Sequence, residues 1–339
     1  MQWTEFENTR ANGPTGRVND IAVVGEQRWA VSSDGRLFSW QAGAEPTPTA
    51  LPGQQHARCV AFDSGGRIGW VGLLLPKPPT GGNLTRLLKT TDGGANWVPV
   101  GNLPADPAEG VCGISVVHPT LAFACGTYNA ATPGVWQTRD GTNWSSLGLP
   151  GGVSGLTDIK FWNATDGIVI GKKKDSAQRT SPLILLTNDA GVTWQTAAVP
   201  DDLQDGAHCW KVHRCNVHLF YVTVAGTGAH GVVLKSTDGG RNWQALQVSD
   251  STATVVDWQL QGIEFINPTR GWVGQHGGPA FETTDGGQSW QPADPTLVNL
   301  NRFAVTSEGL YATGDSIYLG SVPRRRPPGS HYNSSTSKV

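Results

Sequence analysis

The fold is decided by a short polar turn that ends in tryptophan, Thr90-Thr91-Asp92-Gly93-Gly94-Ala95-Asn96-Trp97. Four further copies surround Asp140, Asp189, Asp238 and Asp285, and the five aspartates are separated by about 47 to 49 residues when their positions are subtracted. A period of this length is typical of repeat arrays and propeller blades. The segment is therefore interpreted as a structural repeat and not as a single site.

The residues of the repeat explain why it forms a turn. Asp and Asn side chains accept or donate hydrogen bonds to nearby backbone groups, and the glycines supply positive φ, so the segment closes a hairpin. The tryptophan that follows begins the next strand and buries a large surface between units. These tryptophans are Trp97, Trp144, Trp194, Trp243 and Trp290. Bound calcium is the alternative interpretation, but one acidic residue per loop offers few of the oxygen ligands that calcium needs.

Composition favours one closed array of short strands. The chain has 339 residues with 44 Gly and 22 Pro, and 38% of it is hydrophobic. Such a composition suits many strands and turns, and because no long stretch has helical periodicity, we expect little helix. The net charge of −2 provides no general field for nucleic acid or for an anionic membrane.

Counting the units predicts an all-β, seven-bladed β-propeller of four-stranded antiparallel blades. Each repeat reads as four strands, with the polar turn between the third and the fourth. Residues 20–40 form a further blade whose turn is reduced to Ser33-Asp34-Gly35, and residues 301–320 supply only three strands. We expect the N-terminal segment Gln2-Trp3-Thr4-Glu5-Phe6-Glu7 to supply the missing strand and close the ring, since closure removes open sheet edges.

The pattern [Ser/Thr]-x-Asp-x-Gly-x-x-Trp resembles the Asp-box, or BNR repeat, of sialidases, sortilin-type receptors, some glucanases and the photosystem II stability/assembly factor family. Four copies match in full, and the copy at Asp140 is one residue short. One stretch of a blade is most similar to the assembly-factor group: Gly271-Trp272-Val273-Gly274, followed by residues 281–287. The resemblance implies a non-catalytic protein-binding or assembly module within a larger complex, such as a virion or a secretion machine. A glycan-binding protein or glycoside hydrolase is the alternative.

Two segments are expected from composition: a propeller over residues 1–322 and an Arg/Pro/Ser-rich tail over residues 323–339. The tail cannot bury a core. It is either a solvated end or a docking segment in which Arg324, Arg325 and Arg326 bind an acidic partner.

No signal peptide and no apolar span of membrane length is visible. We expect a cytoplasmic or assembly-associated protein if Met1 is native, and a periplasmic or extracellular one if a leader was removed.

The two rims of such a propeller carry different loops. The repeated hairpins and the first-to-second strand turns share one rim, called here the box rim. The opposite, variable rim carries loops of unequal length at residues 76–83, 129–133, 172–181, 201–208 and 249–257. Binding residues are often placed on variable loops of a rigid scaffold, so we expect binding there and at the channel mouth. The candidate residues are Lys172, Lys173, Lys174, Arg179, His208 and His276.

Metal and catalytic sites have weak signals. His208, Cys209, His213 and Cys215 lack the close ligand pairs of known zinc sites, and strand alternation would place Cys209 on one face with Lys211. Asp158, Asp257 and Glu264 lie on or near innermost strands, where a glycosidase would need two carboxylates across a sugar. We interpret each of these carboxylates as structural. The five cysteines are interpreted as buried thiols, with a Cys112–Cys125 disulfide as the alternative.

No metal, cofactor, nucleic-acid partner, membrane insertion or catalytic residue is predicted. The expected partners are protein subunits, with a glycan as the alternative.

Overall fold

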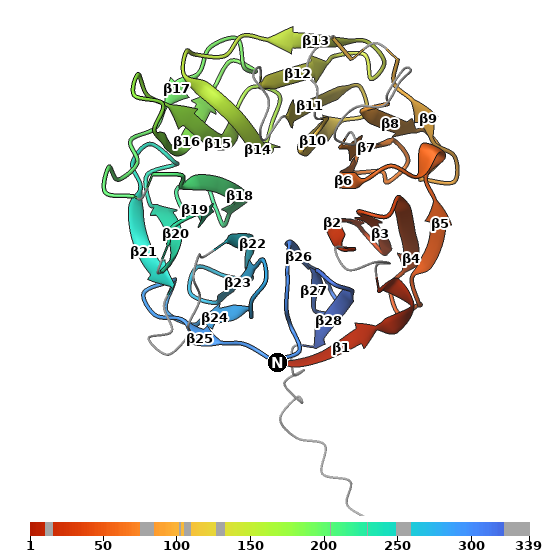
Figure 1. Ribbon diagram of the computed structural model, residues 1–339. Helices are drawn as coiled ribbons and strands as arrows, with labels where there is room; N and C mark the ends of the chain where they lie inside the picture. The colour runs from red at the N-terminus through yellow and green to blue at the C-terminus, as the bar shows by residue number, and fades with distance from the viewer. Residues whose placement is uncertain are drawn as a thin grey trace, which may run out of the picture.

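Seven four-stranded antiparallel sheets surround a central axis in the computed structural model of the chain (Figure 1). The structure describes residues 1–10, 16–74, 85–101, 103–104, 110–126, 133–203, 205–228, 230–248 and 259–321. Within these residues the secondary structure is almost all β, with two short 3-10 helices, η1 (Glu7–Thr9) and η2 (Pro52–Gln54). The predicted seven-bladed propeller is confirmed.

The strands follow the predicted order from the channel outward in each blade. Blade 1 contains β2 (Val18–Val24), β3 (Gln27–Ser32), β4 (Arg36–Gln41) and β5 (Thr47–Ala50), and blade 2 contains β6 (Ala57–Phe62), β7 (Gly69–Leu73), β8 (Leu87–Thr90) and β9 (Val98–Pro99). Blade 3 contains β10 (Gly113–His118), β11 (Leu121–Gly126), β12 (Gly134–Thr138) and β13 (Trp144–Leu147), and blade 4 contains β14 (Val153–Phe161), β15 (Gly167–Lys174), β16 (Thr180–Thr187) and β17 (Gln195–Thr196). Blade 5 contains β18 (His208–Arg214), β19 (Phe220–Ala225), β20 (Gly231–Ser236) and β21 (Gln244–Val248), and blade 6 contains β22 (Leu260–Phe265), β23 (Gly271–Gln275), β24 (Phe281–Thr283) and β25 (Gln291–Pro292).

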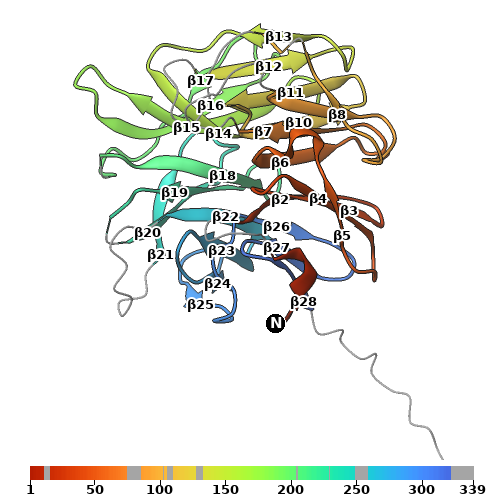
Figure 2. The same cartoon turned by 45° about the vertical axis from the view of Figure 1, so that its right-hand side comes forward.

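The ring closes through the N-terminal strand, as predicted. Blade 7 contains β26 (Arg302–Val305), β27 (Leu310–Thr313) and β28 (Ile317–Ser321), and β1 (Gln2–Phe6) pairs antiparallel with β28 as its outermost strand (Figure 2). Thr9 then locks the junction, because its fully buried Oγ1 accepts the backbone N–H of Ile317 at 2.8 Å and lies 2.8 Å from the hydroxyl oxygen of Ser316. The two ends of the propeller are thus joined by a sheet ladder and by buried polar contacts.

Each repeated turn is a hairpin held by its aspartate. In blade 5 the Asp238 carboxylate accepts hydrogen bonds from the Ser236 hydroxyl at 2.8 Å and from the Asn242 backbone N–H at 3.0 Å. The Ser236 hydroxyl oxygen in turn accepts the Gly240 N–H at 2.9 Å, and the Trp243 indole donates to the Gly240 carbonyl at 2.7 Å. The carboxylates of Asp92, Asp189 and Asp285 make the same bonds to the residues two before and four after them.

The shorter copy in blade 3 keeps the carboxylate bonds over a tighter turn. Asp140 accepts the backbone N–H groups of Thr142 at 2.8 Å and of Asn143 at 2.6 Å. The indole N–H of Trp144 is buried without a hydrogen-bond acceptor, and the ring packs edge-on against Trp70. The hairpin therefore tolerates loss of one residue because the aspartate, and not the indole bond, closes the turn.

Aromatic side chains fasten each hairpin to the preceding blade. Trp29 of blade 1 stacks on Phe62 of blade 2 with 3.7 Å between ring centroids, and its indole donates to the Gly93 carbonyl at 2.9 Å. Trp97 then covers the other side of Phe62 edge-on. The second strand must carry glycine here, since a Cβ on Gly69 would lie 2.6 Å from the Phe62 ring. The same arrangement recurs at Phe123, Phe161 and Trp194, and at Tyr221, Phe265 and Trp290.

The hairpin carboxylates make stability depend on pH. Hydrogen bonds from the Asn242 backbone and side chain lower the pKa of Asp238 from 3.8 to about 2. A depressed carboxyl pKa stabilises the fold above the unfolded value, and that contribution is lost as pH falls through the folded value. We therefore expect Asp238→Asn to lower the melting temperature at pH 7, and we expect the difference from wild type to shrink as pH falls from 4 to about 2.

Thermal unfolding followed by circular dichroism between pH 7 and 2 measures this effect. The matched control is Asp201→Asn, because Asp201 is exposed and makes no hydrogen bond to the described residues. Its melting curve should follow wild type throughout. A difference between Asp238→Asn and wild type that stays constant over the whole pH range would contradict the expectation.

Candidate functional site

The inner strands line the channel, and β-bulges aim charged side chains into it. The strand register shifts between Leu156 and Asp158 in β14, and between Cys209 and Val212 in β18. A bulge places two residues opposite one and re-aims the side chains next to it. The expectation that Cys209 shares a face with Lys211 is therefore wrong: Cys209 and Val212 pack in the same hydrophobic cluster, while Lys211 joins the channel charges.

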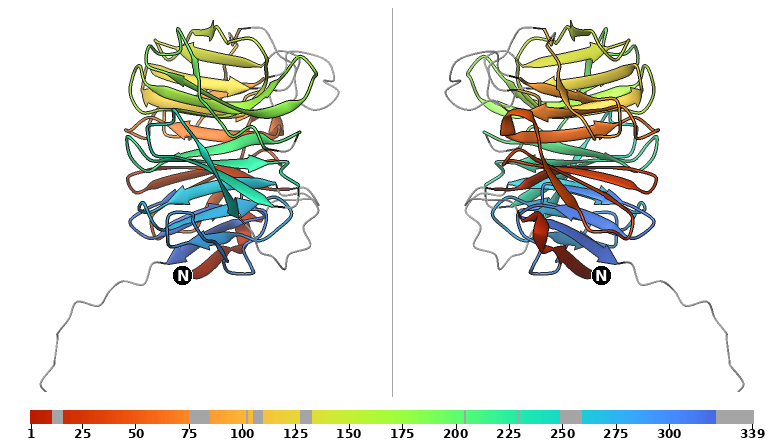
Figure 3. Two further views of the ribbon diagram at one scale, coloured as in Figure 1. Left: turned by 90° about the vertical axis from the view of Figure 1, so that its left-hand side faces the viewer. Right: turned by 90° about the vertical axis from the view of Figure 1, so that its right-hand side faces the viewer.

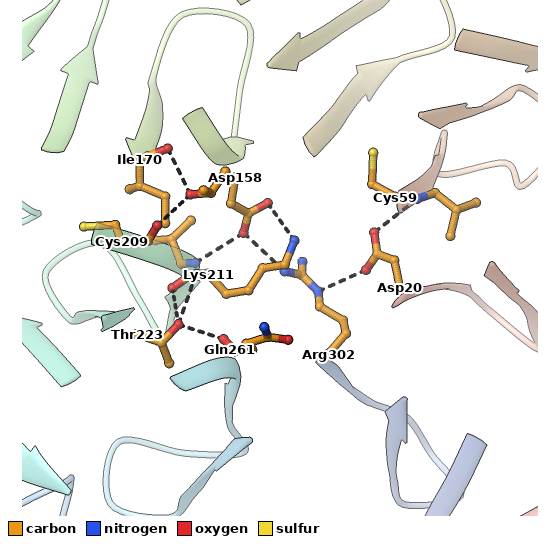
Figure 4. Close-up of polar contacts among 12 residues, drawn as sticks. Asp20, Cys59, Asp158, Ile170, Cys209, Lys211, Thr223, Gln261 and Arg302 are labelled. Atoms are coloured by element: carbon orange, nitrogen blue, oxygen red, sulfur yellow. Dashed lines mark hydrogen bonds and ion pairs between the residues drawn. The ribbon is translucent and has the colours of Figure 1, made fainter. Parts of the chain in front are cut away.

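An ion network spans the channel (Figure 4). Arg302 from blade 7 reaches across to blade 4, where its Nη1 lies 3.2 Å from Asp158 Oδ2, and to blade 1, where its Nε lies 3.4 Å from Asp20 Oδ1. Lys211 Nζ from blade 5 lies 3.7 Å from Asp158 Oδ1. Four of the seven blades therefore meet at these charges.

The same two carboxylates join neighbouring blades through the backbone. Asp20 Oδ2 accepts the N–H of Val60 at 3.1 Å, and Asp158 Oδ2 accepts the N–H of Val212 at 3.2 Å. Each aspartate thus satisfies a donor that the bulged ladder leaves open in the next blade. These contacts give Asp158 a structural role of the kind expected from the sequence.

Charge pairing decides the ionisation of this network. Burial opposes ionisation of Asp158, but the charges of Lys211 and Arg302 hold its pKa well below the ordinary value. Burial likewise lowers the pKa of Arg302, and the carboxylates of Asp158 and Asp20 outweigh burial and raise it. Both groups therefore stay charged at neutral pH.

Glu264 lies on the inner strand β22, as expected, and faces His213. Their side chains approach to 3.3 Å between Glu264 Oε1 and His213 Nδ1. Burial is the largest effect and acts to lower the His213 pKa, but the Glu264 carboxylate and the Cys215 side chain together outweigh burial and raise the pKa to about 9. Glu264 is thus engaged in an ion pair at neutral pH. Asp257 lies outside the described residues.

At the variable rim, cationic and aromatic side chains gather at the channel mouth. The guanidinium of Arg58, from β6, lies 5.2 Å from the ring centroid of Trp210, from β18, and the His208 ring is 5.7 Å from that of Trp210. His56 Nε2 lies 3.1 Å from Asn19 Nδ2. Burial, with a smaller effect from Arg58, lowers the pKa of His56 to about 4, so its imidazole is neutral at pH 7.

The structure brings only some of the predicted rim residues to this mouth. His208 joins Trp210 there, and His276 follows β23, where burial and then the charge of Arg17 lower its pKa. The basic loop of blade 4 is a hairpin extension instead, in which Lys172, Lys173 and Lys174 pair with Pro182, Ser181 and Thr180.

Arg179 is engaged within that loop, where its exposed side chain lies 2.8 Å from the carboxylate of Asp175. Arg324, Arg325 and Arg326 lie outside the described residues, as do residues 76–83, 129–132 and 249–257 of the variable loops. Tail docking and the boundary at residue 322 therefore stay predictions.

Sequence reasoning missed Arg58, Trp210 and Arg302, although a charged residue within an otherwise apolar inner strand was a usable signal. The five cysteines carry free thiols, four of them buried, and Cys112 and Cys125 share a backbone hydrogen bond of 2.8 Å. Among the residues that the structure describes, no three His, Cys, Asp or Glu side chains are placed to hold a metal ion. No helix in the described part of the chain is long and apolar enough to cross a membrane.

These features define a seven-bladed propeller whose blades are closed by hydrogen-bonded hairpins, with an ion network across its channel and a cationic, aromatic mouth. No family model matches the chain. A sequence relative is the photosystem II assembly lipoprotein Ycf48 of Synechococcus sp. strain CC9902, which is 24% identical over 163 residues. The match covers 45% of this chain and 41% of that protein.

Solved structures show the same fold. YCF48 from Cyanidioschyzon merolae gives a TM-score of 0.65 at 17% identity, over 95% of this chain and 99% of that one. YCF48 bound to a D1 peptide gives 0.66 at 17% identity, over 95% and 96% of the two chains. The GH74 xyloglucanase of Xanthomonas campestris gives 0.64 at 14% identity and covers 93% of this chain but 53% of the enzyme. The sequence match confirms the resemblance to the assembly-factor group, and the solved structures confirm the propeller fold.

Removing the central cation should destabilise the ring. Arg302→Leu leaves the buried carboxylates of Asp20 and Asp158 undercompensated, so we expect the free energy of unfolding to fall by about 3–5 kcal/mol. Urea unfolding followed by tryptophan fluorescence measures the change. The control is Arg10→Leu, whose ion pair with Glu5 is largely exposed, and which should cost about 1 kcal/mol or less. Equal losses in the two variants would show that the channel network is not a main source of stability.

Proposed function

We propose that the protein is a non-catalytic protein-binding module of a larger complex, and that it recognises a segment of a partner protein at the channel mouth of the variable rim. The observation that carries this proposal is the cluster of Arg58, Trp210 and His208 at that mouth. Arginine and tryptophan are the side chains that most often dominate protein interfaces.

The ion network in the channel supports binding at the surface of the ring. Below the mouth, Asp158 and Lys211 are almost fully buried and Arg302 is partly buried, and their charges are paired with one another. A ligand therefore meets the cationic and aromatic side chains of the mouth first. Such a mouth suits a peptide segment that lies across it, because side chains can enter it while the backbone stays outside.

The comparisons support a role in assembly. Ycf48 of Synechococcus is named as an assembly lipoprotein, and one YCF48 structure is described as bound to a D1 peptide. By analogy we propose a protein subunit as the partner here, in a complex such as a virion or a secretion or assembly machine. Docking of Arg324, Arg325 and Arg326 on an acidic surface of that complex is part of the same proposal.

Glycan binding or glycoside hydrolysis is the second candidate, favoured by the likeness to the GH74 xyloglucanase and by the aromatic ring of Trp210. Its chemistry would need two carboxylates that face a sugar. Asp158 pairs with Arg302, and Glu264 pairs with His213, so both carboxylates are already engaged. The protein-binding proposal needs no rearrangement of these contacts.

Capture of partners from an extract of the native source tests the proposal. We expect Arg58→Gln combined with Trp210→Ala to reduce recovery of the partner about tenfold or more, since loss of such side chains typically costs over 1 kcal/mol of binding energy each. A chain truncated after residue 322 tests the contribution of the tail. Mass spectrometry quantifies recovery, and circular dichroism checks that each variant is folded.

The control variant is Arg67→Gln, which removes an exposed arginine from the opposite rim and should leave recovery unchanged. Equal recovery with wild type and with the Arg58 and Trp210 variant would reject the channel mouth as the binding site. Release of reducing sugar from xyloglucan by wild type, abolished in Glu264→Gln, would instead establish the glycosidase candidate.

A further inference from the structure

A groove lies on the box rim between blades 4 and 5, away from the channel mouth. Its volume is about 620 Å³, and its lining includes Trp162, Thr193, Arg214, Val217, Phe220 and Arg241. Trp162 follows the last residue of β14, and Arg214 is the last residue of β18. Because β18 also carries Trp210 near its other end, the groove and the mouth lie at opposite ends of one strand. Figure 3 shows the ring edge-on, with the two rims on opposite faces.

Arg214 is held in this groove by aromatic rings. Its guanidinium carbon lies 4.7 Å from the ring centroid of Trp162 and 5.7 Å from that of Phe220. The two rings are themselves in edge-to-face contact at 5.5 Å. The Nε of Arg214 is buried and has no hydrogen-bond partner among the described residues. Stacking thus fixes the plane of the guanidinium and leaves its donors unused.

Three other stacked arginines of this chain are neutralised by carboxylates. Arg28 over Tyr311, Arg36 over Phe38 and Arg270 over Trp272 each have a carboxylate oxygen at 2.9 Å or less. Their partners are Glu308, Asp34 and Glu282. No ion pair joins Arg214 to a described residue, and the same holds for Arg58 over Trp210 at the channel mouth. On the box rim, the stack in this groove therefore lacks the carboxylate that completes those three.

The two aspartates that line the groove, Asp166 and Asp238, already accept hydrogen bonds within the described part of the chain. Asp166 is the acidic residue whose charge acts on Arg214, but it accepts hydrogen bonds from the side chains of Asn163 at 2.6 Å and Thr165 at 3.2 Å. Burial lowers the pKa of Arg214, with Asp166 opposing it. A partly desolvated guanidinium with open donors gains most from a bidentate carboxylate.

Apolar side chains border the same groove. Val217, which lines it, is 61% exposed, and Val192, beside the lining residue Thr193, is 70% exposed. They are two of the four large hydrophobic residues found exposed in the described part of the chain. A fixed cation in a groove that is also lined by an exposed valine favours an occupant that carries both a carboxylate and apolar side chains, as a peptide does.

We propose that this groove binds an acidic segment of a partner protein, in which a glutamate or aspartate side chain pairs with Arg214 and a neighbouring apolar side chain packs on Val192 and Val217. The groove is a second protein-binding surface, on the rim that the repeat pattern alone marks as uniform. Binding in this groove does not require Arg58 or Trp210, so it can be tested separately from binding at the channel mouth.

Binding of capped hexapeptides in which glutamate alternates with leucine tests the proposal, by fluorescence polarisation against the full chain. We expect Arg214→Gln to weaken binding about tenfold or more, because hydrogen bonds to charged groups contribute about 1.5–3 kcal/mol. Arg214→Lys should recover only part of the affinity, since lysine keeps the charge but lacks the planar fork. Raising the salt concentration should also weaken wild-type binding.

The control is Arg270→Gln, which makes the same change in a stacked arginine that Glu282 already pairs, and which should leave affinity unchanged. Trp210→Ala should also bind the peptides normally, which separates this site from the channel mouth. The proposal is overturned if no such hexapeptide binds wild type, if peptides with glutamine in place of glutamate bind equally well, if Arg214→Gln binds like wild type, or if only phosphoserine peptides bind.

Discussion

The ion network around Arg302 is the constraint on which the rest of the ring depends. Seven sheets that meet at one axis bring their inner strands together with bulged ladders, which leave backbone donors such as the Val60 and Val212 N–H groups to satisfy. Asp20 and Asp158 accept these donors, and two buried negative charges then require cations. Arg302 supplies one of these cations across the channel. The same charged residues therefore satisfy the open backbone donors and hold the blades in contact.

Because the charges in the channel are paired with one another, the rims are the surfaces to which recognition is assigned. The hairpins on the box rim are stiff because each carboxylate closes its own turn and each inner aromatic residue ties the turn to the preceding blade, as Trp29 does with the Gly93 carbonyl. Stiffness of this kind fixes side chains without loss of entropy on binding. The stiff rim explains how the rings of Trp162 and Phe220 can fix the Arg214 side chain while its Nε has no hydrogen-bond partner among the described residues.

The fold could be predicted because its signals are local. A hairpin of eight residues carries its own turn chemistry, and the fourth strand of blade 7 was recognisable at Gln2–Phe6 by likeness to the strands after each box. The channel could not be predicted in the same way, because Arg302 and Asp158 are 144 residues apart and meet only when the ring closes. Strict alternation also failed at the β18 bulge, which separates Cys209 from Lys211.

The groove on the box rim could not be predicted from the repeat. A motif that recurs in most blades is explained by its role in folding, and the rim that carries it has a similar sequence in those blades. The residues just outside the motif are not repeated. Arg214 ends the inner strand of blade 5 at the position that Phe265 occupies in blade 6, and Lys235 of blade 5 stands where blade 6 has Glu282. The two blades therefore differ in the side chains that flank the repeated motif and share the same strand pairing. Specificity can arise on a uniform rim through such flanking residues, without disturbing the hairpins that hold the ring together.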